Sequence, residues 1–188
     1  MRKDEFIGLI KKRLPEQSEV HNRTIELSVS SLFNDIIFKR FKKGELDQFA
    51  LPYENIEVQK SGDKFYCDLP VKLIPSPTVF GNVRRIYPSD EDDTFFIMIH
   101  PNRVRLIKHD DLFKAVPVIP YYLKGTNKVF FPVKNMSGIT HVDMNIIPPI
   151  TAYDWEDEIM MPAGSEYNIV KEVASLFMNT PPKDKVND

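Results

Sequence analysis

The stretch that decides the fold class is KFYCDL, residues 64–69, in which apolar and polar side chains alternate. Phe65, Cys67 and Leu69 fall on one face, because successive side chains of a strand point to opposite faces. The alternation therefore predicts a strand with one buried face and one face in water. A glycine-containing turn at residues 60–63 joins this strand to the run Ile56–Gln59, so we expect a hairpin.

Short runs of this type fill the middle of the chain. Ile139–Ile147 repeats the alternation, and the turn residues Gly125-Thr126-Asn127 predict a second hairpin. The chain has 15 prolines against 7 glycines. Because proline cannot donate a ladder hydrogen bond, we expect edges, bulges and bends rather than one broad sheet. The other strands expected are Val83–Tyr87, Phe95–Ile99, Val104–Ile107, Val118–Leu123 and Lys128–Val133.

Helical periodicity flanks this region on both sides. Phe6, Ile10 and Leu14 recur at helical spacing and predict a short helix that Pro15 closes. A last helix is expected after residue 165, with Ser165 as its cap. Helices that precede and follow a run of strands indicate an α+β fold. We expect a mainly antiparallel, sandwich or barrel-like β domain at 45–160, N-terminal helices at 1–44, and a C-terminal helix with an extended tail at 161–188.

A second, longer helix is expected from Asn22 or Thr24 to about Lys43, with Gly44 after its end. Its apolar stripe covers roughly half of the circumference. One interpretation is a helix packed deeply within its own domain. The other is that one face meets the β domain and the opposite face meets a neighbouring subunit. Apolar residues outside the main stripe are Val20, Leu27 and Phe38.

Composition excludes several classes of protein. The net charge of the 188-residue chain is −2, unlike that of a strongly basic nucleic-acid binder. Cys67 is the only cysteine, so an intramolecular disulfide is impossible, and we expect a reducing compartment. No apolar run is long enough to suggest a membrane span, and the N-terminus does not read as a secretory signal.

Motifs for catalysis are absent from the sequence, which has no phosphate-binding loop, no dinucleotide fingerprint and no nucleophile elbow. The best metal candidate is His109 with Asp110 and Asp111, aided by His100, but an ordinary polar turn explains the same residues. Cys67 is expected to be a small buried hydrophobe. We therefore expect no enzyme activity, no cofactor and no metal.

Three features point instead to interfaces. Trp155, the only tryptophan, lies in an acidic stretch and predicts an anchor in a groove of this chain or of a partner. The C-terminal tail is polar, so we expect neighbours to order it. Basic residues lie at the C-terminal ends of the first two expected helices. They either interact favourably with the helix dipole or contact phosphates or acidic partners. The residues expected at interfaces are Val20, Leu27, Phe38, Trp155, Pro181, Pro182 and Val186.

This layout resembles small virion structural proteins of tailed bacteriophages. It is most similar to the ring or adaptor subunits that join portal to tail in short-tailed, crAss-like phages. The residues that carry the resemblance are Asn22–Lys43, Val118–Leu123, Lys128–Val133, Met161–Gly164 and Lys183–Asp188.

The resemblance implies a homo-oligomer, a dodecameric ring whose partners are the portal and other tail or ring proteins. It implies location in the virion after assembly in the bacterial host cytoplasm. It allows non-specific contact with DNA in the channel, and it brings no catalytic residues. One alternative is a cellular α+β module that binds protein or nucleic acid. Another is an unrecognised metal-dependent hydrolase at His100, His109, Asp110 and Asp111.

Overall fold

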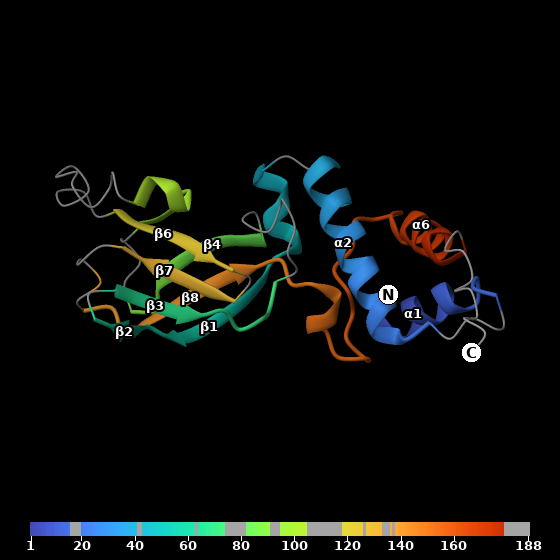
Figure 1. Ribbon diagram of the computed structural model, residues 1–188, viewed down its shortest axis with the longest axis horizontal. Coiled ribbons are helices and arrows are strands. Elements are labelled where there is room, and N and C mark those ends of the chain that lie inside the picture. Colours follow the sequence, from blue (N-terminus) through green and yellow to red (C-terminus); the bar gives the residue numbers. More distant parts are fainter. Residues whose placement is uncertain are drawn as a thin grey trace, which may run out of the picture. The chain divides into compact units, whose positions relative to one another are not determined.

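In the computed structural model the chain forms two compact units (Figure 1). We call Met1–Arg40 with Ile150–Asp188 the helical unit, and Phe41–Pro149 the sheet unit. The fold is α+β, as the sequence predicts. The residues described are 1–15, 20–40, 43–62, 64–73, 82–90, 95–104, 118–125, 127–132, 136 and 138–178.

The helical unit contains α1 (Lys3–Lys11), α2 (Asn22–Arg40), the short 3-10 helix η4 (Ile150–Ala152) and α6 (Glu166–Met178). Each of the three longer helices packs on the other two, and η4 packs on α2. Apolar side chains on one stripe of each helix form the contacts, because these side chains are almost fully buried. They are Phe6, Ile7 and Ile10 of α1, Ile25, Val29, Phe33, Ile36 and Ile37 of α2, and Ile169, Val170, Val173 and Ala174 of α6.

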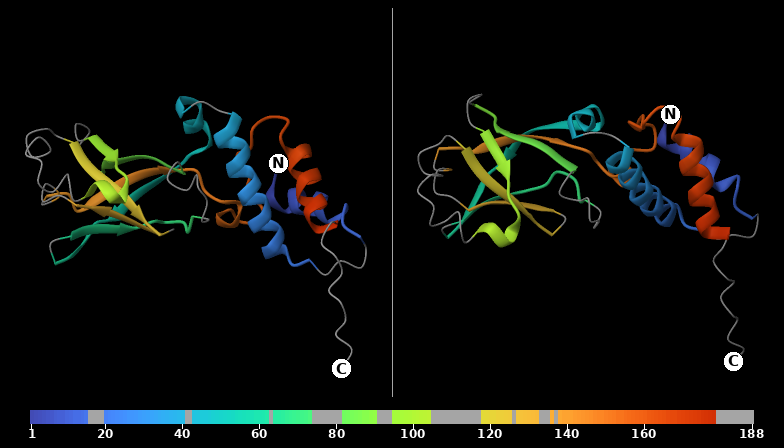
Figure 2. Two further views of the ribbon diagram at one scale, coloured as in Figure 1. Left: turned by 45° about the horizontal axis from the view of Figure 1, so that its top comes forward. Right: turned by 90° about the horizontal axis from the view of Figure 1, so that it is seen from above.

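The sheet unit holds two sheets (Figure 2). The smaller has the order β1-β8-β4, and the larger has the order β2-β3-β7-β6-β5. All pairs are antiparallel except β5 with β6, which is parallel. The strands are β1 (Leu51–Glu57), β2 (Gln59–Ser61), β3 (Lys64–Asp68), β4 (Val83–Pro88), β5 (Phe95–Met98), β6 (Val118–Lys124), β7 (Lys128–Phe131) and β8 (His141–Ile146). The unit also has 3-10 helices η1 (Lys43–Phe49) and η2 (Pro101–Arg103).

One apolar core lies between the two sheets and makes the unit a sandwich. Along β8, the central strand of the smaller sheet, burial alternates residue by residue. Inward-pointing side chains of both sheets belong to a single buried cluster, which burial from water stabilises. They include Val142, Met144 and Ile146 of the smaller sheet, and Cys67, Tyr121, Leu123, Val129 and Phe131 of the larger.

Both predicted hairpins are present, but the first strand of the first one differs from the predicted Ile56–Gln59. Gln59–Ser61 pairs with β3, whereas Ile56 and Glu57 belong to β1 and pair with β8. Ser61 pairs with Lys64 across the first turn, and Lys124 pairs with Lys128 across the second. Gly62 and Gly125 both have positive φ angles, of 60° and 70°, in these turns. Glycine adopts this conformation without the steric cost that a Cβ atom brings. The sequence therefore specified these turns locally.

Three sequence expectations need correction. The long helix ends at Arg40, and Gly44 lies within the 3-10 helix η1 instead of closing α2. Val104 ends η2 rather than opening a strand, and residues 105–107 lie outside the described part. Residues 150–160 were expected in the β domain, but the structure groups them with the helical unit. The reason is contacts distant in sequence, which periodicity does not reveal.

Among the described residues, no helix is long and apolar enough to cross a membrane.

Candidate functional site

The first residues of the chain are fixed along the segment that precedes α6. The Lys3 and Asp4 amides donate to the Asp157 and Trp155 carbonyls, both at 3.0 Å. The Ile159 amide donates to the Met1 carbonyl at 3.1 Å. Because an extended segment needs partners for its backbone groups, this antiparallel bridge sets the position at which α1 begins.

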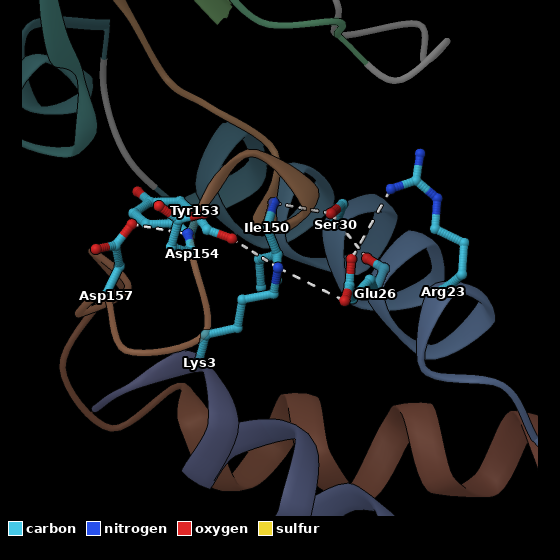
Figure 3. Close-up of polar contacts among 8 residues, drawn as sticks. All are labelled: Lys3, Arg23, Glu26, Ser30, Ile150, Tyr153, Asp154 and Asp157. Atoms are coloured by element: carbon cyan, nitrogen blue, oxygen red, sulfur yellow. Dashed lines mark hydrogen bonds and ion pairs between the residues drawn. The ribbon is translucent and has the colours of Figure 1, made fainter.

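The Lys3 side chain is buried, and Figure 3 shows it between Tyr153 and Glu26. Its ammonium donates to the Tyr153 carbonyl at 2.7 Å and lies 3.5 Å from the Glu26 carboxylate. A lysine removed from water is costly unless its charge is paired and hydrogen-bonded. Glu26 supplies the opposite charge and is itself approached at 4.0 Å by the exposed Arg23. The pair therefore joins α1, α2 and the segment after η4.

Ser30 continues this network one turn further along α2 (Figure 3). Its hydroxyl donates to the Glu26 carbonyl at 2.8 Å and accepts from the Ile150 amide at 2.9 Å. Ser30 is fully buried, so its hydroxyl satisfies an amide that burial would otherwise penalise. This contact places η4 on α2.

The segment after η4 forms a tight turn at residues 154–157, which we call the Trp155 turn. The Asp157 amide donates to the Asp154 carbonyl at 3.2 Å, and the Asp154 amide donates to the Asp157 carboxylate at 2.7 Å (Figure 3). Trp155 and Glu156 occupy the centre of the turn. The Trp155 ring lies 5.0 Å from the Lys3 ammonium, yet the residue is 43% exposed. The turn therefore offers a large aromatic surface with carboxylates around it.

A second feature of the helical unit is a groove between α1 and α6, which we call the α1–α6 groove. Its volume is about 290 Å³, at the lower end of the range for small-molecule sites. Val170 is buried at the groove, and Leu9 and Tyr167 are exposed along it. The Arg13 guanidinium lies 4.7 Å from the Tyr167 ring centroid, a cation–π contact. The residues that line the groove are Met1, Leu9, Arg13, Glu166, Tyr167 and Val170.

The larger sheet carries a row of aromatic rings on its outer face. Tyr66, Phe130 and Tyr122 are direct cross-strand partners, and adjacent ring centroids are 5.6 Å apart in stacked geometry. Lys128 lies over the Tyr66 ring and Lys124 over the Phe130 ring. The rings cover one another's faces, so the row stabilises the sheet as cross-strand pairs do.

Within the described ranges, no group of three or more His, Cys, Asp or Glu side chains could hold a metal ion. His100 caps η2 by accepting from the Asn102 amide at 3.3 Å. His109, Asp110 and Asp111 lie outside the described residues. Cys67 is fully buried, as predicted, and burial raises the pKa of its thiol to about 12, with the nearby Asp68 carboxylate adding to the rise. A protonated thiol is a poor nucleophile.

Of the seven predicted interface residues, three have side chains that the structure describes. Val20 precedes α2 and is half-buried, whereas Leu27 on α2 is exposed. Trp155 is exposed and lies on the N-terminal bridge. The Phe38 side chain lies outside the described part, as do Pro181, Pro182 and Val186.

Sequence reasoning missed the buried polar network and the groove. In the sequence, Lys3 is one of several charged residues of a polar N-terminus, and none of its neighbours indicates that it is buried. Glu26, Ser30 and Asn34 did carry a signal, because polar residues at i, i+4 and i+8 lie beside the apolar stripe of α2. All three are buried.

Comparison with models of known protein families finds no match. Comparison with curated protein sequences finds none either.

Proposed function

We propose that this chain is a non-enzymatic structural subunit that assembles with further copies of itself through its helical unit. The observation that carries the proposal is the distribution of exposed apolar side chains. Of the ten large hydrophobic residues exposed in the described part of the chain, eight belong to the helical unit. They are Met1, Leu9, Leu27, Trp155, Met160, Tyr167, Leu176 and Met178.

Single exposed hydrophobic residues are ordinary, but apolar residues gathered along a groove mark interaction sites. Met1, Leu9 and Tyr167 gather in this way along the α1–α6 groove. The groove is small and has few polar lining groups, which suits side chains of a protein partner better than a cofactor. The Trp155 turn adds an aromatic residue of the type that anchors interfaces.

The resemblance to phage ring and adaptor subunits gives this proposal its specific form. We infer a virion protein of the head-to-tail connector or tail, assembled as a ring of twelve copies beside the portal. The α+β order and the near-neutral charge of −2 support it, since an outer ring needs no strongly basic surface.

Native mass spectrometry of the purified chain tests self-assembly. One copy has a mass of 21.8 kDa, so each oligomer has a distinct multiple of that mass. We expect oligomers whose abundance rises with concentration, with a ring of twelve as the largest closed species. A chain that stays monomeric over the whole accessible concentration range would contradict the proposal.

A second candidate function, binding of single-stranded nucleic acid, has one observation in its favour. Lys124 and Lys128 lie beside the aromatic row of the larger sheet, and lysine with aromatic rings is a combination that such sites use. Binding of this kind weakens steeply with salt. Fluorescence anisotropy of a labelled DNA strand at low and high salt checks it, with Lys124→Glu as the variant expected to lose binding.

A further inference from the structure

We propose that the Trp155 turn of one copy docks into the α1–α6 groove of a second copy of this chain. The inference rests on the proposed self-assembly and names the two surfaces that make the contact. Both belong to the helical unit, so each copy carries one turn and one groove.

The groove and the turn match in size and polarity. The groove holds about 290 Å³, and its sides include the apolar Leu9 and Val170. Such a volume admits a large side chain rather than a cofactor. Trp155 is 43% exposed, so much of its apolar surface is still in water in the single copy. Burying this surface in the groove would be favourable by the hydrophobic effect.

Charge complementarity identifies the occupant as a second copy. Lys11, Lys12 and Arg13 are exposed where α1 ends at the groove, and among the described residues that line the groove only Glu166 has a carboxylate. The stretch around Trp155 has the opposite sign, with four exposed carboxylates at residues 154, 156, 157 and 158. Met160 adjoins the same acidic run, and none of the other exposed hydrophobic residues in the described part of the helical unit lies in a comparable one. Opposite charges around an apolar anchor favour association and fix its register.

The turn is held in one shape before it binds. Backbone and carboxylate hydrogen bonds close the turn, and the Trp155 carbonyl accepts from the Asp4 amide. The Lys3 ammonium also fixes one side of the ring. A rigid anchor loses little conformational entropy on binding, so more of the contact energy becomes affinity.

Two kinds of assembly follow from this contact. If two copies exchange turns, the contact is reciprocal and gives a dimer. If the Trp155 turn of each copy binds the groove of the next copy, the contact is head-to-tail and closes into a ring. Either order requires Trp155 of one copy to lie near Leu9 and Tyr167 of another.

Self-association of variants tests the proposal. We expect Trp155→Ala to weaken it about tenfold or more, as removal of an aromatic anchor does, and Trp155→Phe to weaken it less. Analytical ultracentrifugation gives the dissociation constants of self-association, and far-UV circular dichroism confirms that each variant is folded. Met98→Ala is the control, because Met98 is similarly exposed but belongs to the sheet unit.

Charge reversal tests the partner's identity. Lys11→Glu with Lys12→Glu should weaken association, as should Glu156→Lys with Glu158→Lys. A mixture of these two variants should associate again, because each supplies the charge that the other has lost. A mixture no stronger than either variant alone would overturn the inference.

Disulfide trapping gives a second measurement, which keeps the Trp155 anchor in place. Glu156→Cys mixed with Tyr167→Cys should form a disulfide between copies under mild oxidation, whereas Glu156→Cys mixed with Met98→Cys should not. The native Cys67 is buried and adds little background. If the wild type is oligomeric but this disulfide does not form and Trp155→Ala leaves self-association unchanged, the docking is overturned and the proposed function is not. Monomeric wild type would overturn the proposed function with it.

Discussion

The Lys3 ammonium and the Glu26 carboxylate form a buried ion pair, 3.5 Å apart, with both side chains less than a tenth exposed. Lys3 also donates to the carbonyl of Tyr153, 150 residues later in the chain. One charged side chain therefore joins the start of α1, the first turns of α2 and the segment that carries the Trp155 turn.

Removal of one partner should destabilise the helical unit strongly. Lys3→Met leaves the Glu26 carboxylate buried without its cation, which costs about 3–5 kcal/mol. Urea unfolding followed by Trp155 fluorescence measures this cost, because Trp155 is the only tryptophan and its ring contacts Lys3. Arg23→Gln is the matched control, since Arg23 is exposed and its loss should cost less than about 1 kcal/mol. Equal losses in the two variants would contradict the buried pair.

The Ser30 hydroxyl should matter more than a similar hydroxyl two residues away. Ser30→Ala removes the acceptor of the buried Ile150 amide and should cost about 1–3 kcal/mol. Ser28 makes the same type of bond to the carbonyl four residues earlier, and Ser28→Ala should change stability by under about 0.5 kcal/mol. Thermal unfolding of both variants gives the comparison. A smaller effect for Ser30→Ala than for Ser28→Ala would speak against the contact that places η4.

Stability of the sheet unit should fall at alkaline pH. Burial raises the pKa of Cys67 from 9.0 to about 12 and that of Tyr121 from 10.0 to about 12, although Arg84 opposes the second shift. The folded chain keeps these protons to higher pH than the unfolded chain. At a pH between the unfolded and folded pKa values of such a group, unfolding therefore releases its proton. The free energy of unfolding falls as pH rises through this range, by about 1.4 kcal/mol per pH unit for each group.

Denaturant midpoints measure this decline when they are taken at neutral pH and at a pH between the unfolded and folded pKa values of Cys67. Cys67→Ala and Tyr121→Phe should each flatten it, because each removes one titrating group. The comparison is between slopes, so the pH-independent cost of the smaller side chain cancels. A decline as steep in both variants as in the wild type would show that other groups cause it.

Two glycines should respond to alanine in opposite directions. Gly8 lies within α1, and an added Cβ atom would meet nothing within 4 Å, so Gly8→Ala should stabilise by about 0.5–1 kcal/mol. Gly62 has a φ of 60° in the first hairpin turn, so Gly62→Ala should destabilise by about 1 kcal/mol or more. Differential scanning calorimetry gives both signs, and stabilisation by Gly62→Ala would contradict the turn geometry.

Much of the fold was predictable because its signals are local. The alternation of Phe65, Cys67 and Leu69 gave β3 and its buried face. The end of α2 was predicted too late, since Gly44 signals a helix end but η1 begins just before it. The site was predicted only in part. Trp155 was named from composition, whereas the groove that includes Leu9 and Tyr167 needs two helices from opposite ends of the chain.

By itself, the sequence determined the helices, the hairpins and the buried faces of the strands. These depend on periods of a few residues, and on glycine where a turn needs a positive φ. Only the tertiary structure decided that Lys3 is buried, that β1 pairs with β8, and that residues 150–160 join the helical unit. Burial of a charge depends on a partner brought close in space, and no local pattern specifies a partner 150 residues away.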